Sequence, residues 1–361
     1  MKRILILTAG FGEGHNSAAR GVRDALARVG TDQVQVEMRD LFPETYGGFN
    51  DLVRRTYLAV INQWPRSWGY MYDWLDGIRN FDQRFARFSR LKAHLARLLE
   101  QFKPDIVVST FPPYPYLLRQ IQGIYHRSKS VVVITDALTV NAIWYQCPAD
   151  YFFPPNEQSA DVLRRARVPD SKIKVVGFPV SPKFADLAEA PSLRADAQRV
   201  RIAYVINAAK RRAPELVRKL TELDVDLTVT VGSDERLRRR VEKAIGNGKL
   251  DIVGWTDEMP RLLCRSHILI GKAGGATVQE TIAAGCPMIV NHVVSGQEEG
   301  NARLIAQTKS GTIAVEPDEV VDQIRRAFAN GGELWQQWAG NIARLSRPRA
   351  ALDLAEFLLS I

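Results

Sequence analysis

The residues best suited to chemistry in this sequence lie in two glycine-rich segments that are far apart in the chain. In the first segment, at 10–16, His15 follows Gly12 and Gly14 and precedes Asn16. The ordinary pKa of histidine lies near neutral pH, so a neutral imidazole can remove the proton of a hydroxyl nucleophile. The residue type alone equally allows a structural role, in which the ring bonds a nearby carbonyl. His15 is therefore a candidate general base with a structural alternative.

The second segment, at 271–277, joins an apolar run at 267–270 to a short alanine-rich helix. We expect the apolar run to be a buried strand, and the helix to start near Thr277 and to stop at Gly285. The unbonded amides of a first helical turn and the positive end of the helix dipole favour a bound phosphate. A polar segment at 295–301 follows the next strand, and its side chains could bond sugar hydroxyls. The pattern predicts a phosphate site beside a sugar-binding loop.

Both segments resemble one known family. Residues 274–287 read Gly-Gly-Ala-Thr-Val-Gln-Glu-Thr-Ile-Ala-Ala-Gly-Cys-Pro, and Gly-Gln-Glu-Glu-Gly-Asn follows at 296–301. This pair resembles the donor-sugar motif of the monogalactosyldiacylglycerol synthase and processive diacylglycerol glucosyltransferase family, which is glycosyltransferase family 28-like and has the GT-B fold. The segment at 7–19 is similar to the first loop of the same family, so the resemblance covers most of the chain.

The resemblance implies an inverting glycosyltransferase that moves a hexose from a UDP-sugar to a lipid hydroxyl, with diacylglycerol as the expected acceptor. The UDP-sugar is then a substrate, and we expect no cofactor and no metal. On the donor side, the resemblance places Glu280 on the ribose hydroxyls, and Gln297 and Glu298 on the sugar hydroxyls. The other donor residues that it implies are Gly254, Lys272, Gly274, Gly275, Ala276, Thr277 and Asn301.

Two of these donor residues have alternative interpretations. Thr277 and Glu280 have the spacing of a capping box, in which the Glu280 carboxylate would bond an amide at the start of the helix. Lys272 either neutralises phosphate or faces solvent. On the acceptor side, the resemblance favours His15 as the base, and the loop residues that it places beside the acceptor are Gly12, Gly14 and Asn16.

Asp136 is the second catalytic candidate. It ends an apolar run at 130–135, at the sheet edge where ligands of α/β proteins gather. It could orient the imidazole of the base, or it could be a structural acid at the end of a strand. The family has a histidine three residues before the tryptophan of this element, whereas Asn141 precedes Trp144 here.

A second departure from the family lies at 207–212. This turn follows the first strand of the second domain, and in the family it is rich in glycine and approaches the diphosphate. Here it contains no glycine and three cations. Either the cations act on the diphosphate as point charges, or the site is altered. The pair Asp224 and Asp226 precedes a strand, on the edge opposite to ligand sites, and does not predict a metal site.

Strand and helix patterns alternate along most of the chain, which predicts an α/β protein with parallel sheets. With 361 residues, two domains are expected. The prediction is two Rossmann-like domains that face a cleft, as in the GT-B type. The expected acceptor domain is 1–178, with 345–361 packing back on it, and the expected donor domain is 179–344.

Composition and charge limit the environment of the protein. The three cysteines show no metal-binding spacing and suggest a reducing compartment, and we expect neither a signal peptide nor a membrane span. The net charge is +9, and arginines and aromatic residues alternate at 42–100. That segment is either an interfacial membrane contact or ordinary core. We expect a cytoplasmic protein that is peripheral on the inner face of the cell membrane, with an anionic membrane surface and no nucleic acid as partner.

Two other functions fit the same features. A UDP-sugar 2-epimerase-type isomerase would share the two-domain plan without a lipid acceptor. A non-catalytic regulator that binds nucleotide sugars would fit the glycine-free turn at 207–212.

Overall fold

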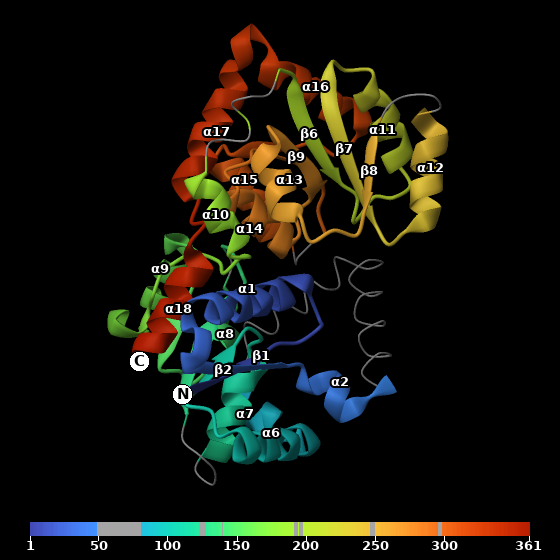
Figure 1. Ribbon diagram of the computed structural model, residues 1–361. Helices are drawn as coiled ribbons and strands as arrows, with labels where there is room; N and C mark the ends of the chain where they lie inside the picture. Colours follow the sequence, from blue (N-terminus) through green and yellow to red (C-terminus); the bar gives the residue numbers. More distant parts are fainter. Residues whose placement is uncertain are drawn as a thin grey trace. The chain divides into compact units, whose positions relative to one another are not determined.

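The structure, a computed structural model, describes residues 1–48, 81–122, 128–138, 140–190, 194, 198–245, 250–294 and 298–361. The chain divides into two compact units. The first comprises Met1–Pro182, Val294–Gly300 and Arg349–Ile361, and the second comprises Lys183–Val293 and Asn301–Pro348. Each unit is built on a parallel sheet with packed helices (Figure 1), which confirms the predicted α/β class with two Rossmann-like domains.

The first unit contains a five-stranded sheet in the order β2-β1-β3-β4-β5. Its strands are β1 (Lys2–Leu7), β2 (Val34–Arg39), β3 (Ile106–Ser109), β4 (Lys129–Val133) and β5 (Tyr151–Phe153), all paired in parallel. Parallel sheets are covered on both faces, which explains why β3 is buried along its whole length. Because the strands are parallel, the segments that follow β1, β3 and β4 meet at one edge of the sheet.

The helices of the first unit include one that passes very close to the backbone of a distant segment. They are α1 (Glu13–Gly30), α2 (Leu41–Tyr46), α5 (Phe81–Phe85), α6 (Ser89–Phe102), α7 (Pro113–Gln122), α8 (Ala142–Tyr145), α9 (Glu157–Arg165) and α18 (Ala350–Ser360). α1 packs against α18, so the C-terminal helix belongs to the core of this unit (Figure 1). A Cβ atom on Gly21 of α1 would lie 2.0 Å from the carbonyl oxygen of Pro179, so this position requires glycine.

The second unit contains a six-stranded parallel sheet in the order β11-β10-β9-β6-β7-β8. The strands are β6 (Val200–Val205), β7 (Val225–Gly232), β8 (Asp251–Gly254), β9 (Ile268–Lys272), β10 (Met288–His292) and β11 (Gly311–Ile313). The helices are α10 (Lys183–Glu189), α11 (Ala213–Thr221), α12 (Glu235–Ile245), α13 (Met259–Arg265), α14 (Gly275–Ala283), α15 (Glu299–Gln307), α16 (Pro317–Phe328) and α17 (Glu333–Leu345). The central strands β9 and β10 carry the donor segments at their carboxyl ends.

The segment 42–100 falls only partly within the described residues, because 49–80 lies outside them. Of its described aromatic rings, Phe81 is 3% exposed and packs into a core cluster, and Phe85 packs against the same cluster. Phe88 is 37% exposed. The described part of this segment therefore contributes mainly to the core. In the described parts of the chain, no helix combines the length and the apolar character that a bilayer crossing requires.

Candidate active site

His15 lies in the first turn of α1, at the sheet edge formed by the ends of β1, β3 and β4. Its Nδ1 atom is 2.8 Å from the carbonyl oxygen of Thr110 and 3.0 Å from the hydroxyl of Thr135. A carbonyl only accepts hydrogen bonds, so Nδ1 carries the proton. Among the described residues, hydrogen bonds to this ring reach Nδ1 only. In the neutral ring, Nε2 then carries a lone pair that can accept a proton.

The surroundings of His15 keep its ring neutral. The ring of Phe111 lies 5.2 Å from it and the ring of Trp144 5.9 Å, measured between centroids. Burial lowers the pKa of His15 to about 4, although the bond to the Thr110 carbonyl partly opposes this shift. A histidine with this pKa is unprotonated at neutral pH, which is the state that a general base needs.

Of the two interpretations of Asp136, the hydrogen bonds do not support the one in which it orients His15. The Asp136 carboxylate accepts a hydrogen bond from the indole Nε1 of Trp144 at 2.9 Å, while the orienting bonds to His15 come from Thr110 and Thr135. Asp136 therefore holds the ring that packs beside His15. Asn141 caps α8 by accepting a bond from the Ile143 amide at 3.1 Å, which is a structural use of this position.

The loop before α1 is held by the carboxylate of Asp40, a residue that the sequence analysis did not identify. Asp40 follows β2, and its Oδ2 accepts a hydrogen bond from the Gly10 amide at 2.8 Å. Its Oδ1 caps α2 by accepting from the Phe42 amide at 3.1 Å. The sequence signal that could have identified Asp40 is its position as an acid between the second strand and a helix. Asp40 therefore ties the loop before α1 to the next element of the sheet edge.

The other acceptor-loop residues leave this edge open. Gly12 is the N-cap of α1 and offers no side-chain cap to the first amides. A Cβ atom on Gly14 would meet no atom of the described residues within 4 Å. The amide oxygen of Asn16 accepts a hydrogen bond from the Thr8 hydroxyl at 3.0 Å. The loop thus presents mainly backbone near the imidazole.

An aromatic cluster borders the same loop. It consists of Phe11, Phe42, Phe111 and Tyr114, whose neighbouring rings lie 5.3 to 6.2 Å apart. The three phenylalanines are only partly buried. Phe111 also contacts His15, so an apolar wall stands next to the candidate base.

The donor segment forms the N-terminus of α14. Gly274 is the N-cap, and it offers no side-chain hydrogen bond to the amides of the first turn. Gly275, Ala276 and Thr277 are partly exposed in this turn. The amide of Asn301 donates to the carbonyl of Ala273 at 3.0 Å, which binds the start of α15 to the turn before α14. Such a helix end can accept an anion.

The capping-box interpretation of Thr277 and Glu280 is wrong. The helix starts at Gly275, two residues before the predicted start, so Thr277 lies inside the helix. Its carbonyl accepts the hydroxyl of Thr281 at 2.6 Å, which is an ordinary bond within a helix. Glu280 is therefore one turn inside the helix and partly exposed, away from the N-cap.

The remaining donor residues lie at the ends of strands or close to them. Lys272 ends β9 and is partly buried, and Gly254 ends β8 and is followed by Trp255, which is 76% exposed. Glu298 is only 5% exposed, and its Oε2 accepts a hydrogen bond from the Val294 amide at 3.1 Å. Gln297 lies outside the described residues. Within those residues, no group of acids, histidines and cysteines could hold a metal ion.

One residue of the glycine-free turn at 207–212 has a backbone conformation that favours glycine. Ala209 has a φ of 50°, in the left-handed region that favours glycine. Two of the three cations are paired: Lys210 with Asp234 at 2.6 Å, which lowers the pKa of Asp234, and Arg212 with Glu316 at 2.7 Å. In this structure, those two charges are directed to carboxylates of the protein.

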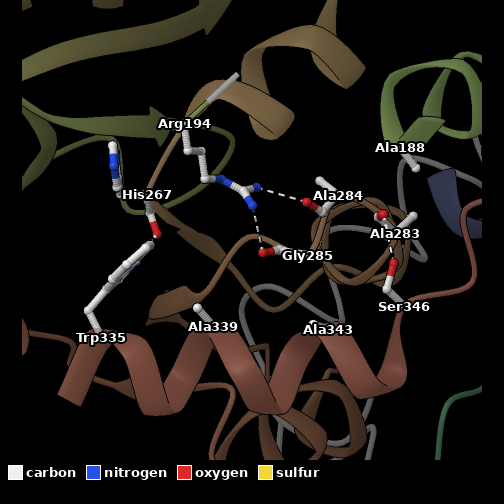
Figure 2. Close-up of a pocket in the computed structure, with 10 residues that line it drawn as sticks. All are labelled: Ala188, Arg194, His267, Ala283, Ala284, Gly285, Trp335, Ala339, Ala343 and Ser346. Atoms are coloured by element: carbon white, nitrogen blue, oxygen red, sulfur yellow. Dashed lines mark hydrogen bonds between the residues drawn. The ribbon is translucent and has the colours of Figure 1, made fainter. Parts of the chain in front are cut away.

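A separate pocket of about 480 Å³ lies within the second unit (Figure 2). Its residues are Ala188, Arg194, His267, Ala283, Ala284, Gly285, Trp335, Ala339, Ala343 and Ser346. The guanidinium of Arg194 donates to the carbonyls of Ala284 at 2.8 Å and Gly285 at 3.0 Å (Figure 2). Arg194 therefore satisfies the carboxyl end of α14, opposite to the N-terminus at which the sequence predicts a phosphate. None of the predicted site residues lines this pocket.

Comparisons with known proteins find a family match in each half of the chain. Residues 15–180 match the family described as monogalactosyldiacylglycerol (MGDG) synthase, and residues 203–337 match the glycosyltransferase family 28 C-terminal domain. The chain is 26% identical over 383 residues to a protein named probable monogalactosyldiacylglycerol synthase 2, chloroplastic, from Oryza sativa subsp. japonica; the match covers 98% of this chain and 80% of the relative. It is 23% identical over 341 residues to the processive diacylglycerol beta-glucosyltransferase of Bacillus subtilis, covering 91% of this chain and 87% of that one.

Solved structures show the same fold at low identity. MurG of Acinetobacter baumannii has a TM-score of 0.63 and 16% identity, with all of both chains covered. The UDP-GlcNAc 2-epimerase of Neisseria meningitidis, bound to UDP-GlcNAc, has a TM-score of 0.60 and 14% identity, also with all of both chains covered. These two likenesses concern the fold alone.

Proposed function

Since the chain belongs to the monogalactosyldiacylglycerol synthase and processive diacylglycerol glucosyltransferase family, we propose that it transfers a hexose from a UDP-sugar to the free hydroxyl of diacylglycerol. The observation that carries the proposal is the hydrogen bond from Nδ1 of His15 to the Thr110 carbonyl, because it leaves Nε2 of the ring as the atom that can accept a proton.

In the proposed reaction, Nε2 of His15 takes the proton of the acceptor hydroxyl. The acceptor oxygen then attacks C1 of the sugar from the face opposite to the diphosphate. The bond between C1 and the diphosphate oxygen breaks, UDP leaves, and the configuration at C1 inverts. A positioned base of this kind contributes about 10²–10⁴ to the rate. The aromatic cluster beside His15 suits the apolar part of a lipid acceptor.

The donor half of the proposal rests on α14. Its first amides and dipole would hold the diphosphate and stabilise the charge that develops there when UDP leaves. Glu280 would bond the ribose hydroxyls, and Glu298, Asn301 and Gln297 would surround the sugar. Glu298 and Asn301 already hold the backbone of this loop, so their roles would include shaping it.

The proposed location is the inner face of the cell membrane, where the protein would be peripheral. A diacylglycerol acceptor resides in a bilayer, and the net charge of +9 favours an anionic surface. Salt would weaken such an attachment, because screening reduces the attraction.

The test is incubation with UDP-glucose, UDP-galactose or UDP-N-acetylglucosamine and diacylglycerol in mixed micelles, followed by the mass of the products. A hexosyl-diacylglycerol with release of UDP is expected. A parallel sample without lipid tests the isomerase, because the fold is shared with UDP-GlcNAc 2-epimerases. Release of a free 2-epimer in the sample without lipid, with no glycolipid in the samples with lipid, would overturn the proposed transferase function. Tight UDP binding without any product would favour a regulator.

A further inference from the structure

The outer face of α12 carries four exposed cations in a row. The helix contains five cations and two acids. Leu237 and Val241 are buried and attach the helix to the second unit. The opposite positions, Arg236, Arg239, Arg240 and Lys243, are exposed. Their spacing of three, four and seven residues puts them on one side of the helix, along about 10 Å of its axis. We call these four residues the cationic stripe.

The stripe carries an excess of positive charge: α12 has five cations against two acids, of which Glu235 is exposed one turn before Arg239. None of its four members forms an ion pair with a described acid, and the nearby Glu242 is paired with Arg238 at 3.5 Å. The adjacent helix α11 differs: its Arg218 pairs with Glu222, and its Lys219 pairs with Asp318. The two helices lie side by side (Figure 1), so positive charge is concentrated on α12.

The stripe is held rigidly and starts at the edge of the sheet where the donor segments lie. Asp234 accepts the Leu237 amide at 3.0 Å and fixes the first turn of α12. Arg238 donates to the carbonyl of Ile252 at 2.9 Å and ties the helix to β8. Because α12 follows β7, its first turn is at the carboxyl ends of the strands. Arg240 donates to the carbonyl of Arg211 at 3.3 Å, so the exposed Arg211 extends the charged surface.

We propose that the cationic stripe binds the headgroups of anionic phospholipids. This inference rests on the proposed function, because a lipid acceptor brings the protein to a bilayer. The chemistry fits a charged surface: four long cations on one convex helix face, with no aromatic side chain among residues 236–243. Single-stranded nucleic acid would require aromatic platforms on which bases stack, and the stripe offers none. Binding is electrostatic, without insertion.

The test is co-sedimentation with phosphatidylcholine vesicles, with and without phosphatidylglycerol, using a variant with three substitutions, Arg236→Gln, Arg239→Gln and Lys243→Gln. Arg240 is kept because it bonds the backbone at Arg211. Each basic residue near an anionic surface contributes about fivefold, so the partition coefficient should fall about 100-fold on anionic vesicles. Glutamine preserves helix propensity, and circular dichroism checks the fold.

The matched control carries Lys309→Gln, Arg326→Gln and Arg344→Gln, which removes the same charge from exposed positions elsewhere in the second unit. Its partition coefficient should stay within about threefold of the parent, because charges farther than a Debye length from the lipid are screened. Equal losses in both variants would overturn the inference and leave only an effect of net charge. Loss of binding to oligonucleotides, with unchanged vesicle binding, would assign the stripe to nucleic acid and also overturn it.

The outcome is separable from the proposed function. The stripe variant should keep its transferase rate on diacylglycerol dispersed in neutral detergent micelles, because no stripe residue is placed in the active site. If the parent protein has no transferase activity, the proposed function fails, and the vesicle measurement still decides on the stripe. If the variant loses micellar activity while keeping vesicle binding, the stripe is not a lipid contact.

Discussion

The neutral state of His15 gives the sharpest prediction, because it can be tested by changing only the pH. The pKa of this residue is lowered from 6.5 to about 4. At pH 5.5, a histidine with an ordinary pKa would be only about 10% unprotonated, whereas His15 would be about 97% unprotonated. Turnover at pH 5.5 should therefore be nearly equal to turnover at pH 7.5, and it should fall only as the pH approaches 4.

The same shift affects the free energy of unfolding, with a sign that can be worked out. Between pH 6.5 and 4, the unfolded chain binds a proton at this position and the folded protein does not. Stability is therefore fully present above pH 6.5 and is lost as the pH falls toward 4, by about 3 kcal/mol for a shift of this size. The rate must accordingly be measured together with a denaturation curve at each pH, so that loss of folded protein is not counted as loss of the base.

The matching variant is His15→Ala. Turnover with UDP-sugar and micellar diacylglycerol should fall by about 10²–10⁴, while UDP affinity measured by calorimetry stays unchanged. The part of the pH dependence of stability that belongs to His15 should also disappear. A rate midpoint near pH 6.5 in the parent would show that the ring is solvated like a free histidine. Near-normal turnover in the folded variant would move the base elsewhere, and a loss of UDP binding would make His15 a donor contact.

Three further predictions concern other residues. Glu280→Ala should weaken UDP binding by about 1–3 kcal/mol through the loss of ribose bonds, and unchanged calorimetric affinity would remove Glu280 from the site. Asp136→Asn keeps an oxygen that can accept from the indole of Trp144, so turnover should fall far less than in His15→Ala; comparable losses would restore Asp136 as a catalytic acid. Gly21→Ala should lower the free energy of unfolding by about 1–3 kcal/mol or more, read from urea curves, because its Cβ would lie 2.0 Å from the oxygen of Pro179.

The strands were the most predictable part of the fold. Runs such as 4–7 and 268–270 are apolar because both faces of a parallel sheet are covered, and this signal is local in sequence. The start of α14 was less predictable. Its N-cap is Gly274, which has no side chain and leaves no capping signature, whereas Thr277 and Glu280 have a capping spacing inside the helix. A backbone cap is visible only once the backbone is known.

The sequence predicted at which edge of the sheet the site lies, because parallel strands bring their carboxyl ends together. It did not predict the hydrogen-bond partner of each side chain. The choice between Thr110 and Asp136 as the group that orients His15 depends on the packing of Trp144. The indole of Trp144 donates a hydrogen bond to the Asp136 carboxylate and packs beside the imidazole. The spacing of these residues in the sequence does not predict that packing. Asp40 was missed for the same reason, since its hydrogen bond to the Gly10 amide joins residues thirty positions apart.

The turn at 207–212 shows how a missing sequence signature can leave the geometry in place. The family resemblance predicts glycine there, and the chain has none, yet Ala209 adopts the left-handed conformation that glycine would supply. A residue with a Cβ atom pays roughly 1–2 kcal/mol for this conformation, so the surrounding fold must hold it. The nearby pair of Lys210 and Asp234 links this turn to the end of β7 and provides one such restraint. Residue 209 therefore carries a methyl group at a position whose φ favours glycine.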